Sequence, residues 1–484
     1  MATDRLENNG GINDFRLNHF SRLKGFGKEL GQRLIGRDRA TRQEGQLRLF
    51  EPSILELSDE VVDSIRATYA MEGKRRNAID FDLAPEDLRY SRFLKFTRSA
   101  PTVPEWREII RDLQVLHRIS REMEVPNDPK VALQLGFLQD TLAAHILFYQ
   151  EKLGIKLPWE DRVKITQGFT PQEIDETVIR AQLEAAKIHF PGNWNKASIE
   201  KFRSKTLSPA DFTREITEHS QTLLVSLSRF LGRDFQPTYR VTQDSVDEYW
   251  INWTDGKRDD FRLRVNTHPR HAHKLTKAKA WAMSVHEVGG HVAQMYGWQR
   301  AIDEGKTIPA LGITSLHIPE QVACEGIAQT LHHFVPELLQ MLPEDALFEL
   351  ELEGVRQLAY NNLQIRANRA KSQGKRFDLR RAVHYIQEFF PAEPAEEVAK
   401  QLDERTKDGE RNPYLLSYGM GFLLHRQIAT QLRTEGKKKL LEVIFSQPTS
   451  PRQEFEIAQA IVSNPNYGYS PLKNPFVLED TPLD

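Results

Sequence analysis

The chain has 484 residues, of which 39% are hydrophobic and 28% charged, with a formal net charge of −2. This composition is typical of a globular protein with two or three folding units, and the charge gives no general reason to bind nucleic acid. With no apolar run long enough for a bilayer, no signal peptide in the polar N-terminus and one cysteine, Cys324, we predict a cytoplasmic protein without a transmembrane segment or internal disulfide.

Residues 1–50 hold ten Lys and Arg against six Asp and Glu, and apolar residues recur every three or four positions from Leu17 to Leu34. This pattern is typical of a basic amphipathic helix. We predict an N-terminal arm, which either binds a membrane surface or partner or docks on its own domain.

Helical signals dominate the rest of the chain, and the predicted fold is mainly α. The region 51–235 is predicted to be an N-terminal helical region, with helices at 103–123 and 129–153 and helix starts at Thr170-Pro171 and Ser208-Pro209. The helix that begins at Ser208 should end at Gly232. The region 236–484 is predicted to contain the functional site, with helices at 343–372 and 413–434 and another starting at Ser450-Pro451.

One segment, 247–265, breaks the helical pattern. Two extended runs flank Asp255-Gly256, which is a strong turn signal, and Phe261, Leu263 and Val265 alternate with arginines. We therefore predict a small β-hairpin directly upstream of the most distinctive motif in the chain.

That motif is HEVGGH, in which His286 and His291 enclose Glu287 and two glycines. Two imidazoles can bind zinc, and the adjacent carboxylate can accept a proton from a metal-bound water. Residues five apart lie on different faces of a regular α-helix, so both histidines can share one ion only if the helix is locally widened as a π-bulge. We predict such a bulge, with Gly289 and Gly290 adopting the unusual dihedral angles that it requires.

A third ligand is available in the segment IPEQVACEGIAQ, which reads as the next helix. Glu325 on this helix would complete an open two-His, one-Glu site for Zn²⁺. Glu320 is the alternative, although its position in the first turn is equally explained by the helix dipole. Gln329, one turn after Glu325, could hydrogen-bond a ligand. Cys324 is predicted to be packed in the core.

HExxxH followed by a helix with EGxA resembles the gluzincin-type zinc metallopeptidases with an expanded zinc helix. The first motif resembles that of dipeptidyl-peptidase III (HELLGH), and HEVGGH with CEGIA resembles the HEIGTH and QEGLA motifs of the microtubule tyrosine carboxypeptidases. An uncharacterised helical bacterial peptidase family with HExxPGHxxQ and EGWA is similar over about 240–435. Relative to that family the chain lacks one residue between the histidines and has Ile327 in place of tryptophan.

The resemblance implies a zinc-dependent hydrolase of peptides or small amides, with His286, His291 and Glu325 as ligands and Glu287 as general base. It also implies that the hairpin is an edge strand that pairs with substrate. For the oxyanion we consider Tyr418 and Tyr414 on the helix NPYLLSYGMGF. Should the enzyme trim C-termini, the carboxylate-binding candidates are Arg366, Arg369 and Arg426.

Two other classes fit parts of the pattern. A non-heme iron oxygenase uses the same two-His, one-carboxylate set, but it would leave Glu287 without a role. A helical binding protein could hold a purely structural zinc, which would normally be closed by a fourth protein ligand.

Overall fold

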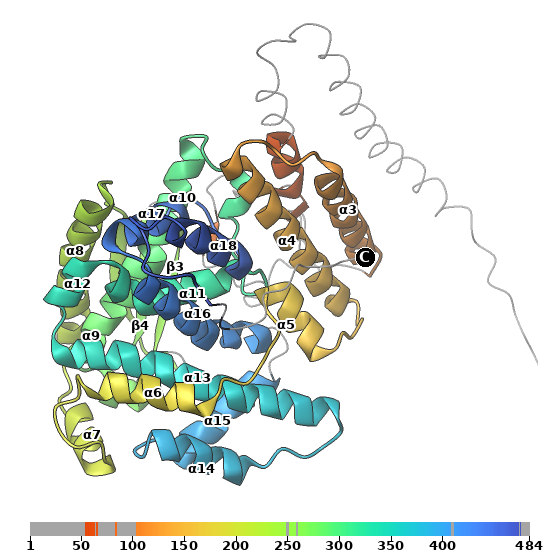
Figure 1. Cartoon of the computed structure of the whole chain (residues 1–484). Coiled ribbons are helices and arrows are strands. Elements are labelled where there is room, and N and C mark those ends of the chain that lie inside the picture. The colour runs from red at the N-terminus through yellow and green to blue at the C-terminus, as the bar shows by residue number, and fades with distance from the viewer. Residues whose placement is uncertain are drawn as a thin grey trace, which may run out of the picture.

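The computed structural model describes residues 54–62, 64–65, 83–84, 103–247, 251–257, 260–407, 411–473 and 475. The predicted N-terminal arm at 1–50 lies outside these residues. As predicted, the described chain is mainly α-helical with one small sheet (Figure 1). Its helices are α3 (Val103–Glu122), α4 (Pro129–Lys152), α5 (Trp159–Gln167), α6 (Glu176–Lys187), α7 (Lys196–Arg203), α8 (Pro209–Leu231), η1 (Pro269–Lys274), α9 (Lys277–Met283), η2 (Ser284–Val292), α10 (Ala293–Asp303), η3 (Pro309–Gly312), α11 (Glu320–Phe334), α12 (Pro336–Met341), α13 (Glu344–Ser372), α14 (Leu379–Phe389), α15 (Ala395–Lys407), α16 (Arg411–Gln431), α17 (Thr434–Ile444) and α18 (Pro451–Val462).

The sequence signals for helix ends are mostly confirmed. Ser208 caps α8, which ends at Gly232 in the left-handed conformation, and Ser450 forms a capping box with Gln453 at the start of α18. The predicted start at Thr170 is wrong, because α6 begins after Asp175, which serves as its N-cap. The side chain of Asn362 explains the difference: it hydrogen-bonds both the N–H and the carbonyl of Ile174, at 2.7 Å each. These long-range bonds replace the helical bonds that Ile174 would otherwise make.

The predicted hairpin is present, but it belongs to a four-stranded sheet with the order β1-β3-β4-β2. Strand β3 (Asn252–Lys257) pairs antiparallel with β4 (Asp260–Asn266), which in turn pairs parallel with β2 (Thr238–Asp244). Lys257 of β3 still pairs with Asp260 of β4, so Asp255-Gly256 lies inside β3 and not at the turn as predicted. Within the described residues, strand β1 (Leu83–Ala84) pairs with Gly256 and Lys257 of β3.

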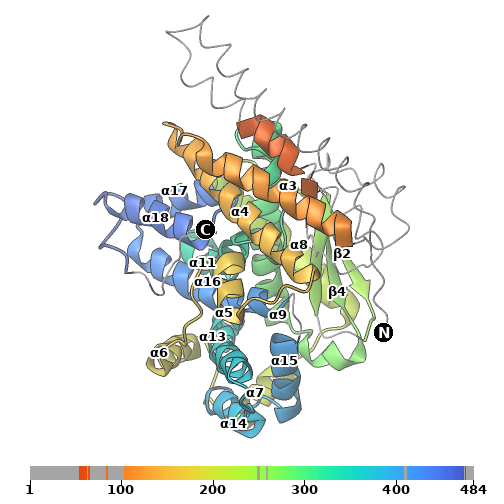
Figure 2. The same cartoon turned by 90° about the vertical axis from the view of Figure 1, so that its right-hand side faces the viewer.

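Among the described residues, the buried hydrophobic side chains form one large core, a smaller one and a minor cluster around Leu147 and Ile318. The smaller core combines 54–65, α3 and α4 with residues 308–313, whereas the large core extends from Val163 to Leu472. The predicted boundary at residue 235 therefore does not separate two cores, since α5 to α8 pack with the C-terminal helices. Figure 2 views the molecule from the side of α3 and α4 and shows β2 and β4 next to α8.

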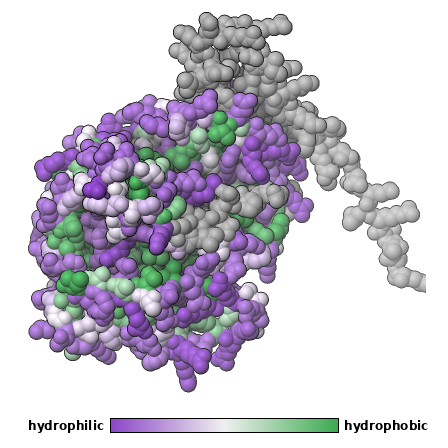
Figure 3. Space-filling model, in the orientation of Figure 1, coloured by the Kyte–Doolittle hydropathy of each residue, from purple (hydrophilic) through white to green (hydrophobic). Residues whose placement is uncertain are grey.

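Helix α4 has the length and apolar composition of a membrane-spanning helix, but 72% of its most apolar window is buried within the protein. It provides much of the smaller core, including Phe137, Leu138 and Leu142. The face seen in Figure 3 is largely hydrophilic, with hydrophobic side chains in scattered areas. Cys324 is buried, as predicted.

Four helices determine where the candidate site lies. The continuous helix α9–η2–α10 lies between α8 and α11, and α11 packs along much of α16 in the middle of the molecule (Figure 1). Helix α13 runs across α16 and α9. Strand β3 approaches η2 from the sheet. The motif helix, the EGxA helix and the late tyrosine-containing helix are thus direct neighbours.

Candidate metal centre

The HEVGGH motif forms a π-helix, η2, between the α-helical segments α9 and α10. In a π-helix each residue bonds to the one five positions away, so side chains five apart lie on a common face. His286 and His291 consequently point the same way, with their Nε2 atoms 3.3 Å apart. The widened turn predicted from the five-residue spacing is confirmed.

The two glycines are required for close packing and not for unusual dihedral angles. Neither Gly289 nor Gly290 has a positive φ. A Cβ on Gly290 would lie 2.5 Å from Cα of Ala328 on α11, and one on Gly289 would lie 2.6 Å from a methyl group of Leu223 on α8. The glycines thus allow η2 to lie directly against the helix that carries Glu325.

A second glycine contact fixes α11 on its other side. A Cβ on Gly326 would lie 2.1 Å from Nδ1 of His425, and one on Gly421 would lie 2.4 Å from the carbonyl oxygen of Val322. Helices α11 and α16 therefore touch through backbone atoms. This contact places Glu325, which precedes Gly326, next to the tyrosines of α16.

The predicted metal ligands come together. Oε2 of Glu325 lies 3.3 Å from Nε2 of His286 and 3.6 Å from Nε2 of His291. Ligand atoms about 2.0–2.2 Å from a tetrahedral zinc ion are about 3.3–3.6 Å apart, so the three atoms have the spacing of a zinc site. Glu320, the alternative ligand, instead accepts a hydrogen bond from the backbone N–H of Ser315.

The two oxygens of Glu325 have different surroundings. Oε1 accepts a hydrogen bond of 2.5 Å from the hydroxyl of Tyr414. Oε2 is buried and, among the described residues, has no hydrogen-bond partner. A buried carboxylate oxygen without a partner is costly, and a cation shared with the two imidazoles would satisfy it. Although burial acts to raise the pKa of Glu325, the imidazoles of His291 and His286 hold it below its usual range, so the carboxylate is ionised.

The predicted general base, Glu287, is held by the sheet. Its Oε2 accepts a hydrogen bond of 2.5 Å from the hydroxyl of Thr254, and its Oε1 accepts one from the side-chain amide of Asn252. Both donors come from β3, and Oε1 lies 3.8 Å from Nε2 of His286. Neither Asn252 nor Thr254 is among the site residues predicted from the sequence. Their signal was present, since residues two apart on a strand face the same side.

The Thr254 hydroxyl should position Glu287, and Thr254→Val tests this role. We expect kcat on any hydrolysed substrate to fall about 10–150-fold, because a lost buried hydrogen bond to a charged group costs roughly 1.5–3 kcal/mol. Metal content should not change. Thr254→Ser keeps the hydroxyl and should restore most of kcat, which steady-state kinetics measures. Equal losses for both variants would contradict the positioning role.

Tyr414 and Tyr418 form a hydrogen-bonded chain that ends on Glu325. Their hydroxyl oxygens are 2.6 Å apart, and because the proton of Tyr414 is donated to Glu325, Tyr418 donates to Tyr414. Burial raises the pKa of Tyr418 well above its usual value, and the charge of Glu325 raises it further. Tyr418 therefore stays protonated at neutral pH. Its ring stacks beside that of His286, with centroids 6.5 Å apart.

Tyr414→Phe should weaken metal binding about 10–100-fold, the usual effect of removing a hydrogen bond to a metal ligand. The dissociation constant is measured by competition with a chromogenic chelator. The matched variant, Tyr418→Phe, should weaken binding less, because the 2.5 Å hydrogen bond to Glu325 comes from Tyr414. An equal weakening in both variants would indicate that the tyrosines act on Glu325 only as a packed pair.

Other predicted site residues have different surroundings from those expected. The amide atoms of Gln329 are buried without a hydrogen-bond partner among the described residues, so the predicted bond to a metal ligand is not formed. Arg366 pairs with Glu173 and Glu176. Likewise, Arg369 pairs with Glu160, and Arg426 with Glu351. The three guanidinium groups are thus already paired with glutamates, which disfavours their binding of a substrate carboxylate. That role stays a prediction.

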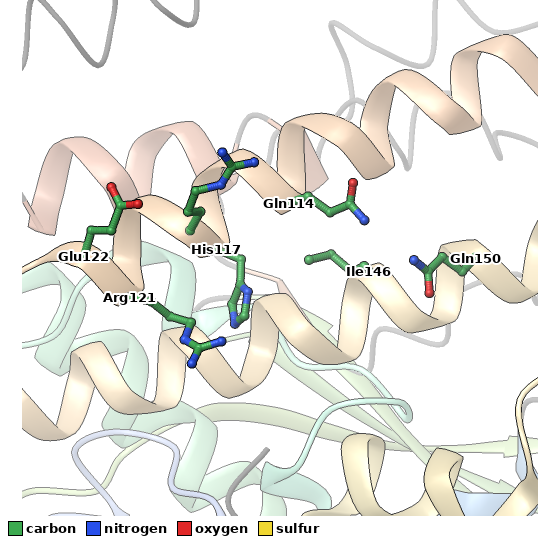
Figure 4. Close-up of a pocket in the computed structure, with 7 residues that line it drawn as sticks. Gln114, His117, Arg121, Glu122, Ile146 and Gln150 are labelled. Carbon is green, nitrogen blue, oxygen red and sulfur yellow. The ribbon is translucent and has the colours of Figure 1, made fainter. Parts of the chain in front are cut away.

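A separate cavity of about 610 Å³ lies between α3 and α4 (Figure 4). Its lining includes His117, Arg121 and Glu122 from α3 and Ile146 and Gln150 from α4. None of the metal-centre residues lines it. Burial and the neighbouring Arg121 lower the pKa of His117. Within the described residues, no group of converging metal ligands includes a residue of this cavity.

Comparison with known proteins does not identify the chain. No protein-family model matches it, and no curated protein matches it. Solved structures that do match include "The crystal structure of the putative lipoprotein from Colwellia psychrerythraea", which is 12% identical. The match covers 75% of this chain and 71% of that chain, with a TM-score of 0.47. A likeness at this level supports no statement about function.

Proposed function

We propose that the protein is a zinc-dependent hydrolase that cleaves peptide or peptide-like amide bonds. The observation that carries this proposal is the convergence of His286, His291 and Glu325 beside Glu287. Two imidazole nitrogens and one carboxylate oxygen at tetrahedral spacing suit a zinc ion. A further carboxylate within a few ångströms of them is suited to act as a general base. Within the described residues this cluster contains no fourth His, Cys, Asp or Glu. That composition favours an open catalytic site over a closed structural one.

A bound zinc ion supplies Lewis acidity, which lowers the pKa of water towards neutrality and polarises a carbonyl group. Glu287 accepts the proton of the attacking water, while Asn252 and Thr254 hold its carboxylate in place. Glu287 then donates this proton to the leaving amine. Tyr418 stays protonated. As the oxyanion develops, the Tyr418 hydroxyl gives up its hydrogen bond to Tyr414 and donates to the oxyanion instead.

The outer side of β3 is suited to hold the substrate chain. Within the described residues no strand pairs with Asn252–Asp255 on that side, because β1 reaches only Gly256 and Lys257. Backbone groups of an extended peptide could pair there, next to the carboxylate that β3 positions. This arrangement favours an extended peptide over a compact amide as the substrate class.

The proposal is tested with purified protein and a mixed library of peptides whose products are identified by mass spectrometry. A chelator should abolish cleavage, and Zn²⁺ should restore it. Ferrous iron with oxygen-dependent turnover and no hydrolysis would instead establish the oxygenase alternative. A protein that binds zinc tightly but cleaves no peptide or amide would support a structural metal site.

A further inference from the structure

A second cluster of metal-ligating side chains lies further along α11. His332 and His333 at the end of this helix both approach Glu351 of α13. Nε2 of His332 lies 3.0 Å from Oε1 of Glu351, and Nε2 of His333 lies 2.5 Å from the same oxygen. Neighbouring side chains on a helix usually diverge by about 100°. These two nevertheless reach the same carboxylate oxygen from the last turn of α11.

The environment of Glu351 resembles that of Glu325, except that Nε2 of His332 is hydrogen-bonded to Oε1 of Glu351. In each case one carboxylate oxygen is held by a fixed donor, Tyr414 for Glu325 and Arg426 for Glu351. The other oxygen faces two imidazole nitrogens. A metal-binding carboxylate is typically oriented in this way by a hydrogen bond to its non-ligating oxygen.

The contact between His333 and Glu351 is not explained by a hydrogen bond. Although Nε2 of His333 is close to Oε1, its direction is unsuitable and the atom has no hydrogen-bond partner among the described residues. A cation bound by the three ligand atoms would satisfy this buried nitrogen, and the imidazole nitrogens, which lie 3.0 and 2.5 Å from Oε1, would move to about 3.3–3.6 Å from it around a tetrahedral zinc ion. The side chain of His332 is fully buried and that of His333 is 24% exposed, so an ion would reach the cluster past His333.

We propose that His332, His333 and Glu351 form a second divalent metal site, distinct from the centre at Glu325. Imidazole and carboxylate donors suit zinc or a neighbouring transition ion. Glu325 and His332 are seven residues apart, which is two turns or roughly 10 Å along the helix axis. The same face of α11 thus carries both sites, and an ion at the second would tie the end of α11 to α13.

The second site should bind more weakly than the first. Arg426 contacts Glu351, and the ammonium group of Lys437 lies 2.7 Å from the backbone oxygen of His333. Both positive charges oppose a divalent cation. The corresponding contact at the first site is the uncharged hydroxyl of Tyr414. A gradual chelator titration should therefore remove the ion at the second site before the ion at the first site.

The test is the zinc content of the full chain after stripping, incubation with excess Zn²⁺ and gel filtration, measured by mass spectrometry. We expect about two ions per chain for the wild type, one for His333→Ala and one for His286→Ala/His291→Ala. The last variant keeps the second site whatever the protein catalyses, so this result is independent of the proposed function. In it, Zn²⁺ should also raise Tm, and adding His333→Ala should remove that shift.

The matched control is His384→Ala, which removes an exposed histidine that pairs with Glu388 on α14. It should retain two ions. One ion in the wild type, or two in His333→Ala, would overturn the second site. A loss of zinc from His384→Ala would also count against it, because the extra ion would then be bound at surface histidines.

Discussion

Glu287→Gln is expected to lower kcat by about 10²–10⁴-fold, the usual contribution of a general base, while zinc content stays the same. The amide cannot accept a proton from water, but it can keep both contacts with β3. Asn252 can donate to the amide oxygen, and the Thr254 hydroxyl can accept from the amide nitrogen. The loss should therefore appear in kcat, with little change in stability. Steady-state kinetics and metal analysis on the same preparation measure both quantities.

Glu320→Gln is the matched control, since Glu320 is also a buried glutamate close in sequence to the metal centre. Its carboxylate contacts the backbone at Ser315 and not the imidazoles. We expect kcat to change only a few-fold. A Glu287→Gln protein with wild-type turnover would remove the general base from the account, even with zinc in place.

Gly290→Ala is expected to cause the largest structural loss in the metal centre. The added Cβ would meet backbone and Cβ atoms of Ala328 at 2.5 Å, and no side-chain rotation can relieve that contact. Overpacking of this kind costs about 1–3 kcal/mol. Because α11 must move away from η2, Glu325 should also move away from the imidazoles. We therefore expect a lower Tm together with reduced zinc occupancy.

Gly289→Ala provides the comparison. Its Cβ would meet the ends of the Leu223 and Leu331 side chains, at 2.6 and 2.9 Å, and these methyl groups can shift. Zinc occupancy should stay close to that of the wild type. Full occupancy in Gly290→Ala would contradict the idea that close contact between η2 and α11 assembles the centre.

The convergence of the candidate ligands could be predicted from the sequence because it depends on short-range spacing. Two histidines five positions apart require either a widened helix or separate faces, and Glu325 on the next helix offers the third ligand. The role of the glycines could not be predicted, because the limiting contact of Gly290 is with Ala328. Only the structure shows that packing, not dihedral freedom, is what excludes a side chain there.

Other features depend on contacts between distant segments. Tyr414 was considered for the oxyanion, but it reaches Glu325, which is 89 residues away in sequence. Thr170-Pro171 is a good local helix start, yet hydrogen bonds from Asn362 hold Ile174 outside the helix. Similarly, an Asp-Gly pair predicts a turn, but pairing with β4 keeps Asp255 and Gly256 in the strand.

The arginines illustrate the same limit for charged residues. Sequence alone places Arg366, Arg369 and Arg426 on helices near the motifs, but it does not reveal their acidic partners. In the structure each guanidinium group has a glutamate within ion-pair distance. Opposite charges that are far apart in sequence cannot be matched without the fold.

An anomalous-scattering map of the purified protein, recorded at the zinc edge, tests the central claim most directly. We predict a peak about 2.0–2.2 Å from Nε2 of His286, Nε2 of His291 and Oε2 of Glu325, with at least one position left for water. A zinc-loaded crystal with no peak among these three atoms, or with a fourth protein ligand closing the site, would contradict the account.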